Sequence, residues 1–401
     1  MDVSKELSIL CQNAVDVISR EDFEQRLLTA KKEKRPLRVK AGFDPSAPDI
    51  HLGHTVLLRK LRQFQDLGHK VIFIVGDFTA TIGDPTGQNK TRPFLSEKEV
   101  KKNAKTYQKQ AFKILDKDPK KIETVRNNTW LGTMPLPEFV GCIASEVTIA
   151  RILERDDFEK RMTENQPIMV REFLYPLLQA YDSVKVKADV ELGGTDQKFN
   201  LLMGRQLQKS FGQKPQVVMT LPLLVGLDGT QKMSKSLGNS IAVTDSPKDM
   251  FGKVMSIPDS LMLAYFRLLT TRSEDQLEFN VQNFPRNAKV ELAVSVVAQY
   301  YGKEVAQQEA QEFDRVFRDK KAPENPDEFK VSKQAIWVVD LLKETGAAAS
   351  GSEARRLIGQ GAVTLDGEKI ADPKALVHIK EGSLLRAGKK RFIKLIVQKS
   401  K

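Results

Sequence analysis

Cysteine is nearly absent from this chain, which has two cysteines in 401 residues. Cys11 and Cys142 lie far apart and do not have the short spacing of a metal-binding motif. The sequence therefore predicts neither a disulfide framework nor a zinc site, and it excludes the small disulfide-rich secreted domains as a class.

Long apolar stretches are also lacking. No run approaches the roughly 18 apolar residues that a membrane-spanning helix needs. The opening stretch "MDVSKELSIL" lacks the basic-then-apolar pattern of a signal peptide. We therefore expect a cytoplasmic protein without a membrane partner.

Both common phosphate-binding loops are missing. The chain contains no G-x-x-x-x-G-K-[ST] loop, and no G-x-G-x-x-G follows its first predicted strand. The chain is instead rich in positive charge, with 64 Lys and Arg against 52 Asp and Glu and a net charge of +12. That charge indicates a polyanionic partner, unless it is spread evenly for solubility. For a chain of 401 residues we expect two or three domains.

An α/β unit is predicted near the N-terminus. Residues 37–43, "LRVKAGF", are strand-like, and the leucines between 54 and 67 recur at helical spacing. The nearly all-apolar run "KVIFIVGDF" (70–78) predicts a central parallel strand that is covered on both faces. A strand, a helix and a strand in this order form a βαβ unit, whose ligands lie at the carboxyl ends of the strands.

Two of the four histidines fall in the turn "HLGH", between the first predicted strand and the helix. His51 and His54 would then lie beside the carboxyl edge of the sheet, where a helix N-terminus favours anions. Taken alone, the pair fits three interpretations: ligands of a phosphate group, structural caps of the helix, or a metal pair completed by a carboxylate such as Asp44.

A second basic motif favours the phosphate interpretation. The segment "GLDGTQKMSKSLGNS" (226–240) places two lysines three apart in a glycine-rich loop. Together, "HLGH" and "KMSKS" resemble the signature of the class I aminoacyl-tRNA synthetases. The resemblance implies that His51 and His54 meet the α-phosphate and the leaving pyrophosphate of ATP. It also implies that the loop closes over the β- and γ-phosphates through Lys232, Lys235 and Ser236.

Polar side chains interrupt an otherwise apolar helix. In "REFLYPLLQAYDSV" (171–184), Tyr175, Gln179 and Asp182 stand at i, i+4 and i+7 and share one helix face. A polar stripe is costly inside a buried helix unless each group has a partner, although a helix with this face in water would show the same pattern. The stretch "ADVELGGTDQKFN" (188–200) predicts a strand that ends at two glycines, and "GDPTG" (83–87) adds Asp84 at another strand end.

With these motifs the resemblance narrows to the bacterial tyrosyl-tRNA synthetases. The matching stretches occur in order between residues 37 and 240: "GFDPSAPDIHLGH", "GDPTG", "YPLLQAYD", "GGTDQ" and "KMSKS". The resemblance implies a Rossmann-like parallel-sheet domain of the α/β class with tyrosine and ATP as substrates. It further implies Mg²⁺ that accompanies the ATP, and no metal that the protein itself ligates tightly.

The family's site residues carry over position by position. Asp182 would accept a hydrogen bond from the substrate phenol, and Gln197 would contact the carboxyl region of the substrate. Arg92 would help to hold pyrophosphate. The α-ammonium group would be held by Asp84, Tyr175 and Gln179. The adenylate and its phosphates would be lined by Asp44, Ser46, Gly53, Gly194, Asp196 and Lys235.

Two positions depart from the commoner pattern of that family. Lys40 stands where many members have a tyrosine that touches the substrate phenol, and Gln88 stands where they have a loop lysine. Lysine at position 40 together with a full "KMSKS" resembles a bacterial subgroup of the family. We predict that Lys40 pairs with a neighbouring carboxylate near the pocket.

The second half of the chain is predicted to hold two further domains. Residues 246–320 lack strand patterning and carry helical apolar stripes, and "DKKAPENPDEFK" (319–330) is rich in proline and charge, as is typical of a linker. We expect a catalytic domain over 1–240 that ends in the lysine loop 232–236. The resemblance implies an inserted dimerisation segment within it, at about 120–190. A helical tRNA-binding domain over 241–320, a linker at 321–332 and a small α+β domain over 333–401 should follow.

The last of these domains is expected to bind RNA. "SGSEARRLIGQGAVTLDGEKI" (350–370) resembles the small RNA-binding domain first seen in ribosomal small-subunit protein four, with Ser352 as the helix N-cap and a strand–turn–strand after it. Residues 333–401 hold 14 Lys and Arg against 7 Asp and Glu, so they carry +7 of the +12. A solvated basic tail would give the same count, but the helix-plus-hairpin order favours RNA. We expect phosphate contacts from Arg355, Arg356, Lys389, Lys390 and Arg391.

A second basic stripe lies on the predicted helix 97–117, where it is either a solvated face or a contact for the tRNA acceptor stem. Its members are Lys98, Lys101, Lys105, Lys109 and Lys113.

The motifs and the resemblance thus predict an ATP-dependent ligase that joins tyrosine to tRNA(Tyr). The resemblance also implies a homodimer, which the sequence alone does not show. A tryptophanyl enzyme shares the fold, but it would need a pocket for an indole N–H. Tryptophanyl enzymes also do not usually carry a basic RNA-binding tail. A non-catalytic RNA-binding protein derived from a synthetase is the other alternative, and the intact phosphate-binding histidines and lysines argue against it.

Overall fold

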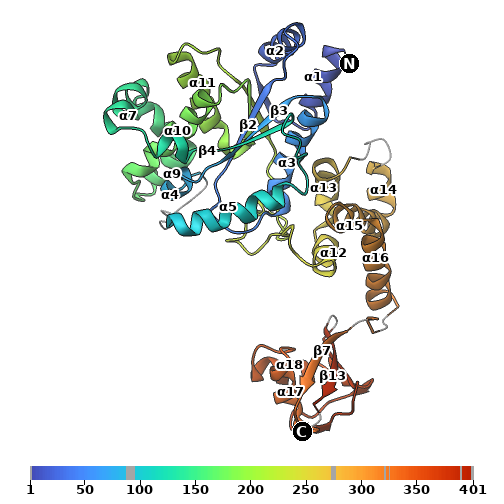
Figure 1. Ribbon diagram of the computed structural model, residues 1–401. Helices are drawn as coiled ribbons and strands as arrows, with labels where there is room; N and C mark the ends of the chain where they lie inside the picture. Colours follow the sequence, from blue (N-terminus) through green and yellow to red (C-terminus); the bar gives the residue numbers. More distant parts are fainter. Residues whose placement is uncertain are drawn as a thin grey trace. The chain divides into compact units, whose positions relative to one another are not determined.

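The computed structural model describes residues 2–86, 95–271, 277–319, 322–324, 326–388 and 391–398. The chain forms two compact units, residues 1–306 and residues 307–401 (Figure 1). Among the helices in these described ranges, none is long and apolar enough to cross a membrane.

A six-stranded sheet forms the centre of the first unit, with the strand order β1-β6-β5-β2-β3-β4. All neighbouring strands are parallel except β1, which runs antiparallel to β6. The strands are β1 (Asp16–Ile18), β2 (Arg38–Phe43), β3 (Lys70–Val75), β4 (Ile122–Arg126), β5 (Val190–Gly194) and β6 (Val217–Leu221). The chain runs outward from β2 to β4 and then returns to place β5 on the other side of β2. The strand order therefore reverses between β2 and β5, which is where open parallel sheets bind ligands.

Helices cover both faces of this sheet. Figure 1 shows α3 (Leu52–Asp66) and α5 (Glu97–Ala111) on one side of the strands and α10 (Val170–Lys185) and α11 (Lys198–Ser210) on the other. The predicted apolar stripe of α3 is buried, including Leu58, Leu61 and Phe64. The predicted βαβ unit is therefore present, although α3 begins at Leu52 rather than at 54 and β3 ends at Val75 rather than at 78.

The remaining helices of the first unit are short, or they follow the sheet in sequence. They are α1 (Val3–Cys11), α2 (Arg20–Lys32), α4 (Thr79–Ile82), α6 (Asn128–Leu131), α7 (Leu136–Cys142), α8 (Ile149–Leu153), α9 (Asp156–Thr163), α12 (Pro247–Met255), α13 (Met262–Leu269), α14 (Leu277–Asn283) and α15 (Pro285–Tyr301), with 3₁₀ turns at Ala144–Glu146, Thr195–Gln197 and Asp259–Leu261. We predicted a helical domain over 241–320. The structure places its helices up to residue 306 in the same compact unit as the sheet. The helix α16 (Lys303–Phe317) follows them.

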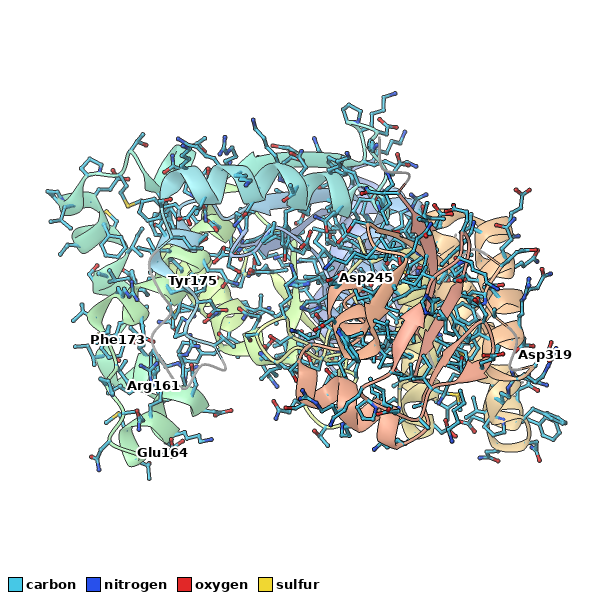
Figure 2. All side chains as sticks on the ribbon, turned by 90° about the horizontal axis from the view of Figure 1, so that it is seen from below. Arg161, Glu164, Phe173, Tyr175, Asp245 and Asp319 are labelled. Carbon is cyan, nitrogen blue, oxygen red and sulfur yellow. The ribbon has the colours of Figure 1, made fainter. Side chains whose placement is uncertain are left out.

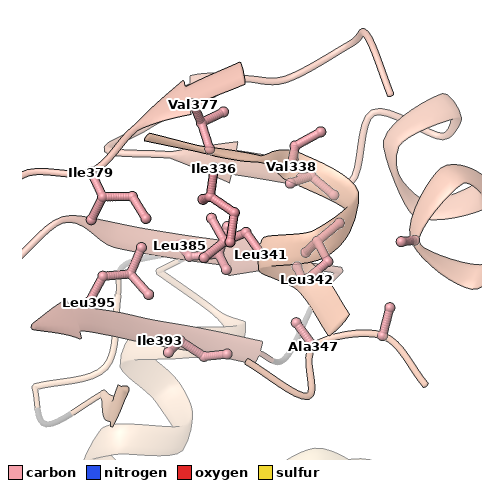
Figure 3. Close-up of a cluster of buried hydrophobic side chains, with 14 of the residues drawn as sticks. Ile336, Val338, Leu341, Leu342, Ala347, Val377, Ile379, Leu385, Ile393 and Leu395 are labelled. Atoms are coloured by element: carbon pink, nitrogen blue, oxygen red, sulfur yellow. The ribbon is translucent and has the colours of Figure 1, made fainter. Parts of the chain in front are cut away.

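The second unit is an α+β fold with its own core. A five-stranded sheet has the order β10-β9-β12-β13-β7, and β11 pairs with β8 in a separate ribbon. Figure 3 shows side chains such as Ile336, Leu341, Leu385 and Leu395 gathered in one cluster. The elements are β7 (Asp327–Val331), β8 (Ala335–Trp337), α17 (Val338–Glu344), α18 (Gly351–Gly359), β9 (Val363–Leu365), β10 (Glu368–Lys369), β11 (Leu376–His378), β12 (Leu384–Ala387) and β13 (Arg391–Val397).

Two details of this unit differ from the sequence prediction. Residues 327–331 form strand β7, parallel to β13, although we placed them in the linker 321–332. The N-cap of α18 is Ser350 rather than Ser352, because the Ser350 hydroxyl accepts the backbone N–H of Glu353 at 3.2 Å. The overall fold class is as predicted: a parallel-sheet domain, helices after it, and a small α+β domain.

Candidate active site

A cavity of about 330 Å³ opens at the carboxyl ends of β2 and β5, where the strand order reverses. Its walls come from both strands, from the N-terminus of α3, from α10 and from the lysine loop. Most of the site residues predicted from the sequence line this one cavity: Asp44, Ser46, His51, Gly53, His54, Asp84, Tyr175, Gln179, Asp182, Gly194, Asp196, Gln197 and Lys232. Lys235 and Ser236 stand in the adjoining loop, and Arg92 and Gln88 lie outside the described residues.

The two histidine rings lie against each other at the start of α3, tilted by 44°. His51 is the N-cap of α3, its backbone N–H donates to Nδ1 of His54 at 3.3 Å, and the ring centroids are 3.9 Å apart. Burial lowers the pKa of His51 to about 2 and that of His54 to about 4, and the Lys235 charge acts in the same direction. Both rings are therefore neutral near pH 7 and can offer N–H donors to an anion. A side chain at Gly53 would come within 3.0 Å of the His51 ring, which explains the glycine between the histidines.

The lysine loop reaches the same cavity. Nζ of Lys232 lies 2.7 Å from Asp196, in the 3₁₀ turn after β5, and Nζ of Lys235 lies 3.4 Å from Asp49 in the turn before His51. Ser236 shares a hydrogen bond of 2.9 Å with Ser234. Both ammonium groups are thus held beside the cavity by carboxylates, which a triphosphate can replace as partners.

The deep end of the cavity is built around Asp182. This carboxylate accepts the indole N–H of Trp130 at 2.8 Å and the side-chain amide of Asn127 at 3.2 Å. Burial raises the pKa of Asp182 to about 6, against the Lys40 charge and these two hydrogen bonds. The two donors fix the orientation of the carboxylate, and a hydroxyl that enters the cavity can still donate to it.

A second carboxylate stands under the middle of the cavity. Asp44 accepts the hydroxyl of Thr79 at 2.7 Å and the phenol of Tyr175 at 3.0 Å. Burial, together with the nearby Asp84 charge, raises its pKa to about 7. Asp84 in turn accepts the side-chain amide of Gln197 at 2.7 Å. The cavity therefore has acidic groups along its floor and cationic groups at its rim.

Lys40 lies behind this floor. Its ammonium group is 2.7 Å from Glu191, and the exposed fraction is 0% for the lysine and 1% for the glutamate. This contact confirms the prediction that Lys40 pairs with a neighbouring carboxylate. Lys40 is also the cross-strand neighbour of Glu191 in the β2–β5 register, which explains how the two side chains meet.

Comparisons with known proteins assign the chain to a family. The family described as "tRNA synthetases class I (W and Y)" matches residues 31–318, and the "Tyrosine--tRNA ligase SYY-like C-terminal domain" matches residues 319–395. The tyrosine–tRNA ligase of Moorella thermoacetica is 50% identical over 400 residues, which cover 98% of this chain and 96% of that protein. The tyrosine–tRNA ligase of Thermotoga maritima is 51% identical over 401 residues, with 98% of each chain covered. The chain belongs to the tyrosine–tRNA ligase family.

Solved structures of synthetases share the fold of this family member. A C-terminally truncated mitochondrial tyrosyl-tRNA synthetase from Aspergillus nidulans superposes with a TM-score of 0.65 at 22% identity and covers 79% of this chain and 94% of its own. A tyrosyl-tRNA synthetase from Archaeoglobus fulgidus, complexed with L-tyrosine, superposes with a TM-score of 0.59 at 23% identity and covers 77% of this chain and 100% of its own.

The predicted RNA-contacting residues of this family member lie in the second unit. Arg355 and Arg356 are exposed on α18, and Arg391 is exposed at the start of β13. Lys389 and Lys390 lie outside the part of the chain that the structure describes. On α5 of the first unit, Val100, Ala104 and Tyr107 are buried, so Lys98, Lys101, Lys105 and Lys109 of the predicted basic stripe lie on the opposite, exposed side. The helix ends at Ala111 rather than at 117, and Lys113 lies beyond it, over the rings of Tyr300 and Tyr301.

Sequence reasoning missed several side chains that support the carboxylates at the floor of the cavity. Trp130 and Asn127 follow the carboxyl end of β4, and Thr79 follows that of β3. Their positions in the sequence could have indicated this role, because residues that follow parallel strands lie at the ligand-binding edge of the sheet.

Proposed function

We propose that this chain is a tyrosine–tRNA ligase. The tyrosine carboxylate attacks the α-phosphorus of ATP, the bond to pyrophosphate breaks, and tyrosyl-adenylate forms. The terminal ribose hydroxyl of tRNA(Tyr) then takes the tyrosyl group and AMP leaves. The observation that carries the proposal is the single cavity lined by His51, His54, Lys232 and Asp182, in a chain about 50% identical to tyrosine–tRNA ligases over nearly its whole length.

The proposed tyrosine end of the cavity is its acidic floor. Asp182 accepts the substrate phenol O–H, and Asp84, Tyr175 and Gln179 surround the α-ammonium group, while Gln197 faces the carboxyl region. Phenylalanine would leave Asp182 without its partner in a buried site, and that cost gives discrimination. The names of the 50%-identical relatives favour tyrosine over tryptophan.

The proposed ATP end is the basic rim. The neutral rings of His51 and His54 donate to phosphate oxygens as negative charge grows on the leaving pyrophosphate, and the loop lysines neutralise the β- and γ-phosphates. Mg²⁺ bound to the phosphates adds to that neutralisation. The described residues contain no group of three or more His, Cys, Asp or Glu side chains that could hold a metal ion. The proposed Mg²⁺ ion enters together with ATP, as part of the substrate. Lys235 and Ser236 are the other proposed phosphate contacts of the lysine loop, and Arg92 is proposed to help hold pyrophosphate. The residues proposed to border the adenylate are Asp44, Ser46, Gly53, Gly194 and Asp196.

The proposed tRNA contacts lie in the second unit, whose excess of +7 over residues 333–401 fits a phosphate backbone. Arg355, Arg356, Lys389, Lys390 and Arg391 are the proposed contact residues. We retain the proposed domain order, with catalysis in 1–240, tRNA binding in 241–320 and RNA binding in 333–401.

We also propose a cytoplasmic homodimer. Between residues 120 and 190 the first unit exposes large apolar side chains, which a partner would cover. Figure 2 shows Glu164 at the outer edge of this segment, with Tyr175 further inside the unit. The exposed apolar residues are Leu136, Val140, Ile149, Met162, Met169 and Val170.

Charging of purified transcripts tests the proposed function. The protein should attach tyrosine to a tRNA(Tyr) transcript in the presence of ATP and Mg²⁺, and it should attach neither tryptophan nor tyrosine to tRNA(Trp). A preparation that binds tRNA(Tyr) but charges no transcript would contradict the proposal and support a non-catalytic RNA-binding protein.

A further inference from the structure

A fully buried ion pair lies beneath the helix that carries the proposed tyrosine-binding face. Nζ of Lys40 donates to Glu191 at 2.7 Å, to the hydroxyl of Ser183 at 2.7 Å and to the backbone carbonyl of Gln179 at 3.0 Å. These three bonds use all three donors of the ammonium group. Lys40 is therefore fixed in place by one strand, β5, and one helix, α10.

Glu191 is equally well bonded. Its two oxygens accept the Ser183 hydroxyl at 2.9 Å, the side-chain amide of Gln179 at 3.3 Å and the side-chain amide of Gln216. Both members of the pair thus hold Ser183 and Gln179, which lie one turn apart on α10. Asp182 stands between these two positions in the helix.

Lys40, Ser183 and Glu191 do not line the cavity, whereas Gln179 and Asp182 do. A cation that only stabilised the fold could stand anywhere in the core, but this one bonds on both sides of Asp182. We propose that Lys40 is a positioning residue for tyrosine recognition, which acts through its buried pair with Glu191 to hold the Gln179–Ser183 turn of α10 and thereby Asp182. This inference rests on the proposed function.

The pair also sets the charge environment of Asp182. The titratable groups that face Asp182 are Lys40 from β2, Glu191 from β5 and Asp44 across the cavity. Burial raises the pKa of Asp182 to about 6, the Lys40 charge is the largest influence that lowers it, and the Glu191 charge raises it by less. Loss of the pair should therefore raise the pKa of Asp182 and make its carboxylate form scarcer near neutral pH.

A neutral double variant tests the proposal. Lys40→Met alone would leave Glu191 buried without its partner and could prevent folding, whereas Lys40→Met with Glu191→Met removes both charges, which proteins often tolerate. The rates of tyrosine- and phenylalanine-dependent exchange of pyrophosphate into ATP would be measured across pH, together with the KM for ATP. The ratio of kcat/KM for tyrosine to that for phenylalanine reports the contribution of Asp182, because only tyrosine has the phenol that Asp182 would bind. Ionisation of Asp44 affects both substrates and therefore cancels in the ratio.

We expect this ratio to fall roughly tenfold near pH 7, which corresponds to about 1.4 kcal/mol. The midpoint of its pH dependence should move upward by about one unit, and the KM for ATP should stay near the wild-type value. Arg26→Met is the control. It breaks another buried ion pair, with Asp189 directly before β5, but Asp189 keeps Arg35 as a partner at 2.8 Å. This variant should fold with a lower melting temperature and an unchanged ratio.

An unchanged ratio and midpoint in a folded double variant would overturn the proposal and leave Lys40 a structural residue. An equal loss of kcat/KM for both substrates would overturn it as well. Absence of tyrosine-dependent exchange in the wild-type protein would instead contradict the proposed function.

Discussion

Nζ of Lys232 lies 2.7 Å from Oδ2 of Asp196, although the two residues are 36 positions apart in the sequence. The contact joins the lysine loop to the 3₁₀ turn after β5, so the loop is docked on the rim of the cavity. Because both partners are partly exposed, solvent screens the pair and a triphosphate can displace the carboxylate.

This arrangement predicts how loss of the loop charge affects the reaction. Lys235→Ala should slow formation of tyrosyl-adenylate by roughly 10²–10³-fold, because neutralisation of the leaving pyrophosphate is weakened. Pre-steady-state measurement of adenylate formation and equilibrium binding of tyrosine would separate the two effects. Tyrosine affinity should remain nearly unchanged. In the control variant Lys248→Ala, on α12, both the rate of adenylate formation and the tyrosine affinity should stay near the wild-type values. A large loss of tyrosine binding would mean that the loop is misassigned.

Trp130 should contribute to the choice of tyrosine through Asp182. Trp130→Phe removes the indole N–H that donates to this carboxylate at 2.8 Å. The remaining unsatisfied acceptor should lower kcat/KM for tyrosine by roughly tenfold, since an unmade buried hydrogen bond costs about 1–3 kcal/mol. The chain has two tryptophans, and the exposed Trp337 allows the matched control Trp337→Phe. Equal kinetics in both variants would contradict this role.

Asp44 should reduce the stability of the unliganded protein in a pH-dependent way. Its pKa is about 7 in the folded chain and about 3.9 when unfolded, so the folded state binds more protons between these values and stability falls as pH rises through them. Asp44→Asn cannot ionise and should melt at a higher temperature than the wild type at pH 8. The difference should disappear near pH 4. A melting temperature below the wild-type value at pH 8 would contradict the inferred cost of ionisation.

The second unit should matter for tRNA and not for activation. Removal of residues 319–401 takes away the whole sheet that includes β7, which a cut at 333 would leave unpaired. We expect unchanged pyrophosphate exchange and a weakened, less salt-dependent charging of tRNA(Tyr), because the lost contacts are to phosphates. Charging rates at two salt concentrations provide the measurement. Undiminished charging would exclude a tRNA-binding role for this unit.

The exposed apolar side chains between 120 and 190 predict the oligomeric state. Val170 is 74% exposed and Ile149 is 66% exposed, so Val170→Glu and Ile149→Glu should convert a dimer to a monomer with little effect on folding. Light scattering after size exclusion would give the mass. Val15→Glu, at another exposed apolar position of the first unit, should remain dimeric. A monomeric wild type would contradict the proposed dimer.

Much of this architecture could be predicted because local sequence determines it. The helical spacing of apolar residues in α3 and the all-apolar run of β3 predict the βαβ unit, and His51 and His54 are placed by that unit alone. Lys232 could be associated with them only through the resemblance to a known family, since no local pattern brings the two segments together.

The floor of the cavity could not be predicted in the same way. Trp130 and Asn127 reach Asp182 because β4 pairs in register with β3 and α10 packs beside them, which depends on contacts far apart in sequence. The choice between Ser350 and Ser352 as N-cap, and the strand β7 among charged residues and prolines, likewise depend on tertiary packing.

Exchange of labelled pyrophosphate into ATP, measured with each amino acid in turn, tests the central claim most directly. If neutral histidines and loop lysines surround a triphosphate above a phenol-binding carboxylate, tyrosine alone should support exchange. Exchange driven by tryptophan, or no exchange with any amino acid, would contradict that account.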